Sequence, residues 1–345
     1  METARQQEIF QVIMEKEPIG ISEILNKLVS KISIPTLNRD LSKLRDGSFI
    51  ASEGKGPGTR YRVNLKGLLN VEINPESYFK IEVDNRKILP RYNPDIFVSL
   101  QSAELFTRQE LTFLEKLTAT HQGKLKKNSP ENYKREFERL MIELSWKSAQ
   151  IEGNTYDLLD TEQLLKYNIL SPGHSVEEAT MLLNHKAAIE YTRENAGWFS
   201  QLTVGKIMDV HTLLIRQLNI SKNLRNRLVR ITGTKYTPPD NQFIIEEAIQ
   251  NLCATVNLID NVYAKAMVTL LCISYIQPFD DGNKRTARLT ANALLMAANR
   301  CPLSYRSTSP GEFKKSMLLF YELNNLTAFK RIFINQYQFA VENYF

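Results

Sequence analysis

The sequence predicts a mainly α-helical protein with a small mixed α+β unit in its amino-terminal part. Two observations predict this class. Over residues 101–345 apolar residues recur at helical spacing, with a single interruption. Residues 1–65 instead show three short helical patterns followed by two short extended ones. Residues 66–100 lie between these parts, and X-Pro pairs interrupt their short apolar runs, so we expect a connector there.

Composition and charge fit a globular protein and exclude several other classes. The chain has 345 residues, 43% hydrophobic and 24% charged, which excludes collagen-like and long disordered proteins. The formal net charge of +6 permits an acidic partner such as nucleic acid, although a mild basic excess commonly belongs to a solvated surface. Cys253, Cys272 and Cys301 lack CxxC spacing, which argues against a disulfide framework and a zinc site.

The apolar runs of the sequence are short. The first ten residues are polar and do not resemble a signal peptide. The longest apolar stretch, residues 266–276, falls well short of the roughly 20 residues that span a bilayer. We therefore expect a cytoplasmic protein without a membrane partner, in which residues 266–276 form a buried helix.

The amino-terminal 65 residues predict three helices and a β-hairpin. The first helix is expected from Thr3 to Glu15, the second after Ile21 with Ser22 as a candidate cap, and the third after the cap Ser33. Two strands, near residues 49–51 and 61–63, enclose a glycine-rich loop. The apolar residues expected to face inward are Ile9, Phe10, Val12, Ile13, Leu37, Leu41 and Leu44.

This order of elements resembles the winged helix-turn-helix family, in which the third helix reads DNA. On that resemblance, the outward side of the helix would reach base edges and phosphates, and the basic wing would contact the DNA backbone. The DNA-binding residues would be Thr36, Asn38, Arg39 and Lys43 on the helix and Lys55, Arg60 and Arg62 on the wing. The unit could instead only pack against a neighbouring domain or another protein, and no sequence pattern separates the two.

The clearest chemistry lies in residues 277–288, QPFDDGNKRTAR. A loop with a proline follows the apolar helix, and a second helix is expected to begin at Gly282-Asn283. A glycine at a helix start exposes backbone N–H groups, which bind anions. Arg285 and Arg288 share one helix face and can together bind phosphate oxygens. With Asp281 as a ligand for Mg²⁺, the string indicates a site for a nucleotide polyphosphate.

The same string resembles the Fic family signature HxFx[D/E]GN[G/K]RxxR. The matching positions are Phe279, Asp281, Gly282, Asn283, Arg285 and Arg288. The similarity extends over roughly residues 100–340 and implies a Fic-type helical domain. Members of the family typically move AMP from ATP to a protein hydroxyl. The resemblance therefore implies ATP and Mg²⁺, a target protein as partner, Asp281 as the metal ligand and Lys284 as a further nucleotide contact.

The one non-helical interruption, residues 225–239, alternates β-branched residues around a glycine, so we expect a β-hairpin. It resembles the flap of the family, which holds the target segment by strand addition. Thr232 and Gly233 of this segment are expected to bind the nucleotide. Phe313 and Tyr321 lie where the family places contacts to adenine, on a loose alignment.

A second motif, residues 148–154, resembles the inhibitory motif [S/T]xxxE[G/N] of the family and is expected on a helix around residues 135–153. By that resemblance, Glu152 pairs with Arg288, with Arg285 as a second candidate, and forces ATP into an unproductive pose. A carboxylate can do so because it mimics the phosphate oxygens that a guanidinium prefers. The inhibitory residues would be Ser148, Glu152 and Asn154.

Gln277 stands where the family has its catalytic histidine. That histidine takes the proton from the attacking hydroxyl, and an amide does not titrate near neutral pH. We therefore expect nucleotide binding to persist and the chemistry to slow by about 10²- to 10⁴-fold. Asp280 is expected to point elsewhere and His211 to be structural. His121, His174 and His185 are expected to be surface or core residues. The catalytic set implied by the resemblance is Gln277, Asp281, Asn283 and Arg285.

Two functions of different classes stay open from the sequence. One is a Fic-type ATP-binding protein related to adenylyltransferases, self-inhibited by Glu152 and weakened at Gln277. The other is a DNA-binding transcription regulator that uses a degenerate Fic domain as a sensor or dimerisation platform. A homodimer fits both. Lys284 replaces the commoner glycine, and because relatives that transfer phosphate share this form, the transferred group is either AMP or a phosphoryl group.

Overall fold

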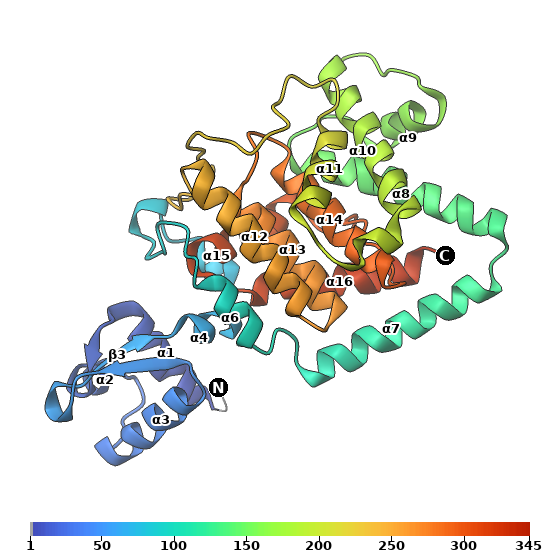
Figure 1. Cartoon of the computed structure of the whole chain (residues 1–345). Coiled ribbons are helices and arrows are strands. Elements are labelled where there is room, and N and C mark those ends of the chain that lie inside the picture. The colour runs from blue at the N-terminus through green and yellow to red at the C-terminus, as the bar shows by residue number, and fades with distance from the viewer. Residues whose placement is uncertain (1–2) are drawn as a thin grey trace.

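The computed structural model describes residues 3–345 and confirms the mainly helical class. Figure 1 shows a small amino-terminal unit beside a larger helical body. The unit contains helices α1 (Ala4–Lys16), α2 (Ile21–Lys27) and α3 (Ile34–Asp46) and strands β1 (Ile19–Gly20), β2 (Ile50–Glu53) and β3 (Arg60–Val63). The strands form one antiparallel sheet in the order β1-β3-β2, with Ile19 opposite Tyr61 and Ile50 opposite Val63.

Local signals account for most of this unit. The Thr3 side chain accepts from the backbone N–H of Gln6 and begins α1, and the Ser33 side chain accepts from Thr36 and begins α3. The expected cap at Ser22 is wrong. The N-cap of α2 is Gly20, which is also the last residue of strand β1. The sequence did not predict this strand. Strand β1 has only two residues, which are too few to show the alternation of apolar and polar residues that predicts a strand.

The core of the amino-terminal unit continues into the helical body. The expected inward-facing residues of α1 and α3 are buried together with Leu68 of α4 (Leu65–Asn70). The same cluster contains Leu319 and Leu323 of α15 (Pro310–Leu323) and Ala328 of α16 (Thr327–Asn343). The remaining connector helices are α5 (Pro75–Tyr78) and α6 (Ile96–Ser102).

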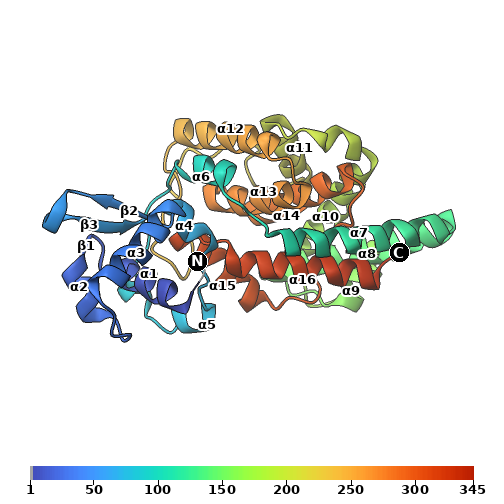
Figure 2. The ribbon, with the colours of Figure 1, turned by 90° about the horizontal axis from the view of Figure 1, so that it is seen from below.

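The helical body is built around α13 (Val262–Ile276), whose side chains are nearly all buried, as expected for residues 266–276. Figure 2 shows α13 and α14 (Asn283–Ala297) lying between α12 (Gln242–Leu258) on one side and α16 on the other. The other helices are α7 (Arg108–Lys127), α8 (Pro130–Ile151), α9 (Leu158–Tyr167), α10 (Val176–Glu194) and α11 (Val204–Leu214). Within residues 3–345, none of the helices has the length and apolar character needed to cross a bilayer.

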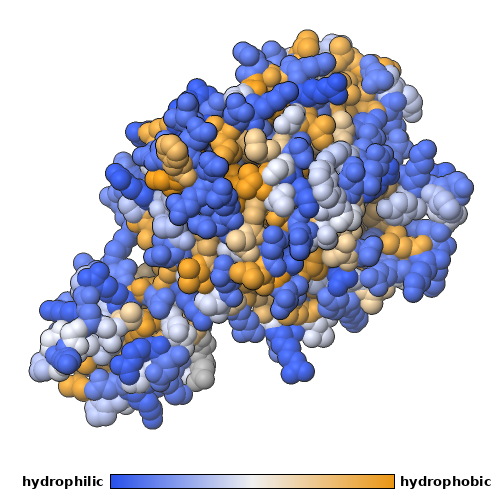
Figure 3. Space-filling view, viewed as in Figure 1, coloured by the Kyte–Doolittle hydropathy of each residue, from blue (hydrophilic) through white to orange (hydrophobic). Residues whose placement is uncertain are grey.

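The surface is mostly polar. On the face shown in Figure 3, hydrophilic residues dominate and apolar residues form small patches. The most exposed large apolar side chains include Phe243 and Leu258 of α12 and Leu159 and Val176 near α9 and α10. Scattered exposed apolar residues are normal for a folded protein, and no function is assigned to them.

The expected β-hairpin at residues 225–239 does not form. A turn is present at Thr232-Gly233, where Gly233 has φ +93, but the two arms contain no strand. Their backbone groups have other partners: Thr237 exchanges hydrogen bonds with Pro90 and Tyr92 of the connector. The guanidinium of buried Arg225 donates to the carbonyls of Arg227 and Pro239. Since these bonds replace the cross-strand ladder, the alternating pattern does not produce a hairpin.

A buried ion pair joins the connector to the helical body. Nη1 of Arg86 lies 2.9 Å from Oε1 of Glu322 on α15, and both side chains are buried. The Tyr78 hydroxyl donates to Oε2 of Glu322 at 2.7 Å, and burial together with that carboxylate raises the pKa of Tyr78. Nη2 of Arg86 also donates to the carbonyl of Gly233. The pair therefore holds the connector, α15 and the 225–239 segment together.

Arg86→Met is expected to lower the free energy of unfolding by about 3–5 kcal/mol, because it leaves the Glu322 carboxylate buried without its charged partner. Adding Glu322→Leu should restore part of that loss. The control Arg62→Met removes an exposed pair with Glu53 and should cost less than about 1 kcal/mol. Urea unfolding followed by circular dichroism measures these differences, and equal losses in the two single variants would contradict the role of burial.

Candidate functional site

The loop between α13 and α14 is held by side chains on both of its ends. The Asn283 side-chain amide makes two hydrogen bonds to the backbone of Phe279. Its Oδ1 accepts from the Phe279 N–H and its Nδ2 donates to the Phe279 carbonyl, each with a donor–acceptor distance of 2.8 Å. Gly282 takes φ +80, a conformation that glycine adopts without strain, and leads directly into α14. The loop therefore presents the start of α14 in one fixed orientation.

His211 of α11 packs against this loop and bonds to its backbone. Its ring stacks on the Phe279 ring with centroids 3.6 Å apart and planes 3° apart, and its Nε2 lies 3.0 Å from the Asp281 carbonyl. Burial lowers the pKa of His211 to about 4, so the ring is neutral near pH 7 and donates through Nε2 to the carbonyl. These contacts are those of a structural residue, the role expected from the sequence.

The first turns of α14 carry two buried arginines. The side chains of Arg285 and Arg288 are almost fully buried, and Nη1 of each has no hydrogen-bond partner within the described part of the chain. The same helix start has no side-chain cap among residues 3–345. Buried donors without acceptors are costly, and an anion at this end of the helix would supply acceptors.

Arg288 is bound by the motif at the end of α8. Its Nε lies 2.8 Å from the Ser148 hydroxyl oxygen, and its Nη2 lies 2.9 Å from the Ser148 carbonyl. Nη2 also lies 3.0 Å from Oε1 of Glu152, so the expected Glu152–Arg288 contact is present. Glu152 itself follows the last residue of α8 as its C-cap.

The second cation on Glu152 is Lys284, and the expected Arg285 contact is wrong. Nζ of Lys284 lies 3.4 Å from Oε2 of Glu152, whereas Nη2 of Arg285 lies 3.3 Å from Asp281. The i to i+4 spacing places Asp281 within reach of Arg285, which explains the difference. Burial alone would raise the pKa of Glu152, but the charges of Arg288 and Lys284 outweigh it, and its pKa lies below the usual value.

Asn154, the last expected residue of the inhibitory motif, does not touch Arg288. Its amide donates to the Glu178 carbonyl at 3.1 Å and accepts from the Tyr156 N–H at 3.0 Å. These bonds fix the chain after α8, where Gly153 adopts φ +98. Asn154 therefore holds the segment that carries Glu152 against α10.

Gln277 is turned toward its own helix. It caps α13 in the left-handed conformation with φ 50, and its Nε2 donates to the Ser274 carbonyl at 2.6 Å. Nε of Arg225 donates to the Gln277 carbonyl. The neighbouring Asp280 carboxylate lies 2.7 Å from Arg227, in agreement with the expectation that it points elsewhere. The Gln277 amide and the Asp280 carboxylate are thus bonded to Ser274 and Arg227.

Asp281 is the one expected metal ligand, and its surroundings fit an ion that is also bound by phosphates. The carboxylate is exposed, with Oδ1 accepting from the Gly282 N–H and Oδ2 near Arg285. Across residues 3–345, no three His, Cys, Asp or Glu side chains gather into a metal cluster. Since Mg²⁺ commonly takes one or two carboxylates with substrate phosphates, Asp281 could hold it together with a nucleotide.

The other expected nucleotide contacts lie apart from the loop or in the interior. Phe313 is buried beside Arg288, whose Cζ is 5.7 Å from the ring centroid. Tyr321 is buried against Tyr236, with ring centroids 5.7 Å apart. Gly233, next to Thr232 in the turn, would place a Cβ 3.6 Å from Leu318 of α15. The structure thus places Phe313 of α15 beside Arg288, whereas the turn at Thr232-Gly233 packs against Leu318 of the same helix.

The expected DNA-binding residues lie on the amino-terminal unit. Figure 1 shows α3 on the side of the unit that faces away from the helical body. Asn38, Arg39 and Lys43 are exposed on this helix, and Lys55 is exposed in the wing. Thr36 is half-buried and its hydroxyl bonds to Ser33, the cap. On the wing, Arg60 pairs with Glu23 and Arg62 with Glu53, so acidic neighbours offset two of the expected cations.

Two residues near the site were not expected from the sequence. Buried His185 of α10 places Nε2 2.8 Å from the Ser148 hydroxyl oxygen, and Arg225 anchors the 225–239 segment to Gln277. Neither belongs to a motif, and each lies at least 37 residues from the group that it contacts. Only the packing of α10 against α8 and α14 brings His185 to the site.

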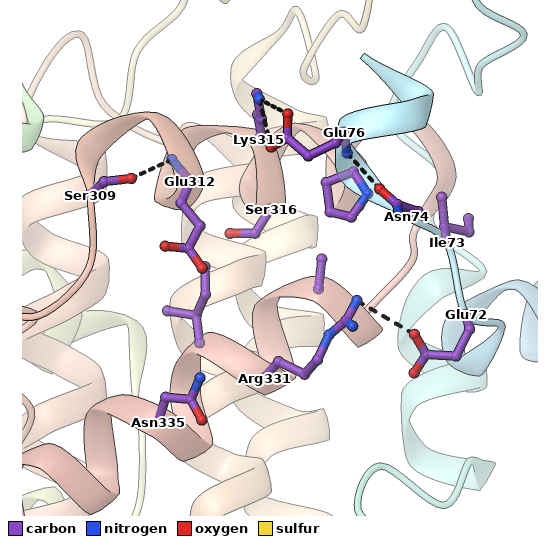
Figure 4. Close-up of a pocket in the computed structure, with 13 residues that line it drawn as sticks. Glu72, Ile73, Asn74, Glu76, Ser309, Glu312, Lys315, Ser316, Arg331 and Asn335 are labelled. Carbon is purple, nitrogen blue, oxygen red and sulfur yellow. Dashed lines mark hydrogen bonds and ion pairs between the residues drawn. The ribbon is translucent and has the colours of Figure 1, made fainter. Parts of the chain in front are cut away.

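A separate surface cleft of about 780 Å³ lies between the connector and helices α15 and α16. Figure 4 shows two ion pairs at its rim, Lys315 with Glu76 at 2.7 Å and Arg331 with Glu72 at 3.4 Å. The residues that line it include none of those expected for nucleotide, inhibition or DNA. We assign no ligand to it.

Comparison with known proteins adds a family match. Residues 201–295 match the model of the Fic/DOC family, a range that contains α11, α13 and the loop before α14. The protein adenylyltransferase fic-1 of Caenorhabditis elegans is 22% identical over 205 residues, which are 57% of this chain and 40% of that protein. The protein adenylyltransferase Fic of Nematostella vectensis is 27% identical over 177 residues, 50% of this chain and 42% of that protein. The chain thus spans about 40% of the length of these curated relatives.

Solved structures show the same fold. Fic-1 (aa134–508) from C. elegans has a TM-score of 0.59 at 18% identity, covering 68% of this chain and 71% of that one. A Fic domain containing signaling protein from Bacteroides thetaiotaomicron VPI-5482 has a TM-score of 0.59 at 20% identity, covering 67% and 94%. At these identities the likeness concerns the fold alone. Residues 201–295 are thus similar to the Fic/DOC family, and the structure shares its fold with solved Fic proteins.

Proposed function

We propose that this chain binds ATP with Mg²⁺ at the start of α14 and that Glu152 inhibits this binding. The observation that carries the proposal is the Glu152 carboxylate on Arg288, beside buried guanidinium nitrogens without acceptors. A carboxylate resembles part of a phosphate group, so Glu152 occupies a position suited to a phosphate. Arg285, Arg288 and Lys284 would bind the phosphates, and Asp281 would hold Mg²⁺, which neutralises phosphate charge when bound.

The reaction that this site supports best is transfer of AMP to a hydroxyl of a target protein, as the names of the relatives suggest. The hydroxyl oxygen forms a bond to the α-phosphorus, the bond to pyrophosphate breaks, and the hydroxyl proton must pass to a base. Gln277 cannot take this proton, because its amide does not titrate near neutral pH and donates to Ser274. We therefore propose an adenylyltransferase-like protein whose transfer step is slow.

Glu152→Gly is expected to tighten ATP binding at least about tenfold in the presence of Mg²⁺. A hydrogen bond to a charged group contributes about 1.5–3 kcal/mol, and releasing Arg288 makes that bond available to a phosphate. Isothermal titration calorimetry on the full chain measures the affinity.

A matched control for that experiment is Glu194→Gly, which removes an exposed glutamate at the end of α10. Its affinity for ATP should equal that of the unchanged chain. If the Glu152→Gly protein does not bind ATP with Mg²⁺, the proposed function is wrong.

Placing a histidine at position 277 tests whether the missing proton acceptor limits the transfer step. With Glu152→Gly, the further change Gln277→His is expected to raise transfer of label from ATP to protein by about 10²- to 10⁴-fold. Label at the α-phosphorus reports AMP transfer, and label at the γ-phosphorus reports phosphoryl transfer, which the Lys284 form leaves open. Equal activity of the Glu152→Gly protein with and without the Gln277→His change would contradict the assigned role of this position.

A second function is favoured by the exposed face of α3. We propose that residues 1–65 form a winged helix-turn-helix domain that binds DNA, joined through residues 66–100 to a Fic-type domain at residues 101–345. In this alternative the chain is a transcription regulator, and the Fic-type domain acts as a sensor or a dimerisation platform. The polar and basic residues Asn38, Arg39 and Lys43 support it, because they project from the helix that such domains place in the major groove.

Arg39→Ala with Lys43→Ala is expected to weaken DNA binding and to reduce the slope of log affinity against log salt by about 1 for each lost phosphate contact. A gel shift on the DNA upstream of the gene, at several salt concentrations, measures both. The charge-matched control Lys126→Ala with Lys127→Ala lies at the end of α7 and should not change binding. Absence of any shift at low salt would leave the amino-terminal unit as a protein-contact module.

A further inference from the structure

We propose that His185 of α10 is a positioning residue that fixes Arg288 in the inhibited arrangement by orienting the Ser148 hydroxyl. The inference rests on the proposed function, since it concerns how Glu152 is held at the nucleotide site. Three helices meet at this point: Ser148 belongs to α8, His185 to α10 and Arg288 to α14. All three side chains are buried.

The direction of each hydrogen bond follows from the chemistry of the groups. The Ser148 hydroxyl oxygen lies 2.8 Å from Nε of Arg288 and 2.8 Å from Nε2 of His185. A guanidinium only donates, so the hydroxyl oxygen accepts from Arg288 and its own proton is free to bond to the imidazole. The ring is neutral because burial and the charges of Arg288 and Arg285 lower the pKa of His185 well below its usual value. A neutral imidazole with its proton on Nδ1 accepts the hydroxyl proton at Nε2, and we assign this tautomer to His185 as part of the proposal.

Stability alone does not account for a histidine at this position. Nδ1 of His185 is buried and has no hydrogen-bond partner in the described part of the protein. A buried polar atom without a partner costs free energy, and a leucine in the same place would carry no such cost. The feature that a leucine would lack is the acceptor for Ser148. We therefore assign the imidazole to that contact.

The contact matters because Ser148 binds Arg288 twice, through its hydroxyl and its carbonyl. These two bonds fix the plane of the guanidinium so that Nη2 faces Oε1 of Glu152. Without the acceptor on His185, the proton of the Ser148 hydroxyl rotates to other partners. The oxygen lone pair that accepts from Nε of Arg288 then has no fixed direction. Glu152 then keeps Lys284 but loses its alignment with Arg288, and the inhibited arrangement weakens.

The test is ATP binding by the full chain, measured by calorimetry with Mg²⁺. In the protein that retains Glu152, His185→Leu is expected to tighten ATP binding by about 3- to 10-fold, the effect of one lost hydrogen bond. In the Glu152→Gly protein the same change should give no tightening, because no inhibitory contact is left to weaken. A purely structural role would lower the affinity in both proteins.

Two further variants locate the effect in the hydrogen bond. Ser148→Ala removes the hydroxyl from the other side, should also tighten binding in the Glu152 protein, and should add little to His185→Leu. His185→Gln keeps an acceptor near the position of Nε2 and should restore the affinity of the unchanged chain. The control His121→Leu makes the same change at a buried histidine that packs against Phe345, and should leave the affinity unchanged.

The outcomes separate the inference from the function on which it rests. Weaker or unchanged ATP binding by His185→Leu in the Glu152 protein overturns the role of His185, while tight binding by Glu152→Gly still supports the proposed function. If Glu152→Gly binds no ATP, both are overturned. Thermal unfolding shows whether each variant is folded, and if His185→Leu does not fold, Ser148→Ala decides the question in the same two proteins.

Discussion

The buried charge of Arg288 constrains the centre of this protein. A guanidinium on an almost fully buried side chain needs acceptors around it, and α8 supplies the hydroxyl and carbonyl of Ser148 and the carboxylate of Glu152. These bonds help to position α8 against α14, together with the buried apolar residues of α8 and the Asn154 hydrogen bonds that hold the chain after it. Ser148 takes Nε and shares Nη2 with Glu152, and Nη1 of Arg288 has no hydrogen-bond partner in the described part of the chain.

The course of the loop before α14 does not depend on the side chain at position 277. Asn283, Gly282 and His211 fix its course with contacts that do not involve position 277. The side chain of Gln277 instead caps the end of α13. Binding and chemistry are thus separate properties of this site, because the groups suited to phosphates lie on α14 and the proton acceptor would lie on the loop. This separation is why a nucleotide-binding protein and a regulator with a degenerate domain are both compatible with the same architecture.

The connector links three parts of the molecule. Arg86 joins Glu322 of α15 and the carbonyl of Gly233, and Thr237 bonds to the connector backbone. Lys87 reaches the carbonyl of Met14 in α1. Residues 84–92 therefore contact the amino-terminal unit, α15 and the 225–239 segment.

Local chemistry determined what the sequence could predict. Ser33 begins α3 and Gly282 precedes α14 because caps and left-handed glycines act over a few residues, and residues 266–276 are buried because they are apolar on all sides. The pairing of Glu152 with Arg288 came from a resemblance between motifs. Tertiary packing alone decided the partners of groups far apart in the chain: Lys284 rather than Arg285 on Glu152, the connector rather than a second strand for residues 225–239, and His185 behind Ser148. A buried polar group takes the partner that the fold places within about 3 Å, and no local pattern records which residue that is.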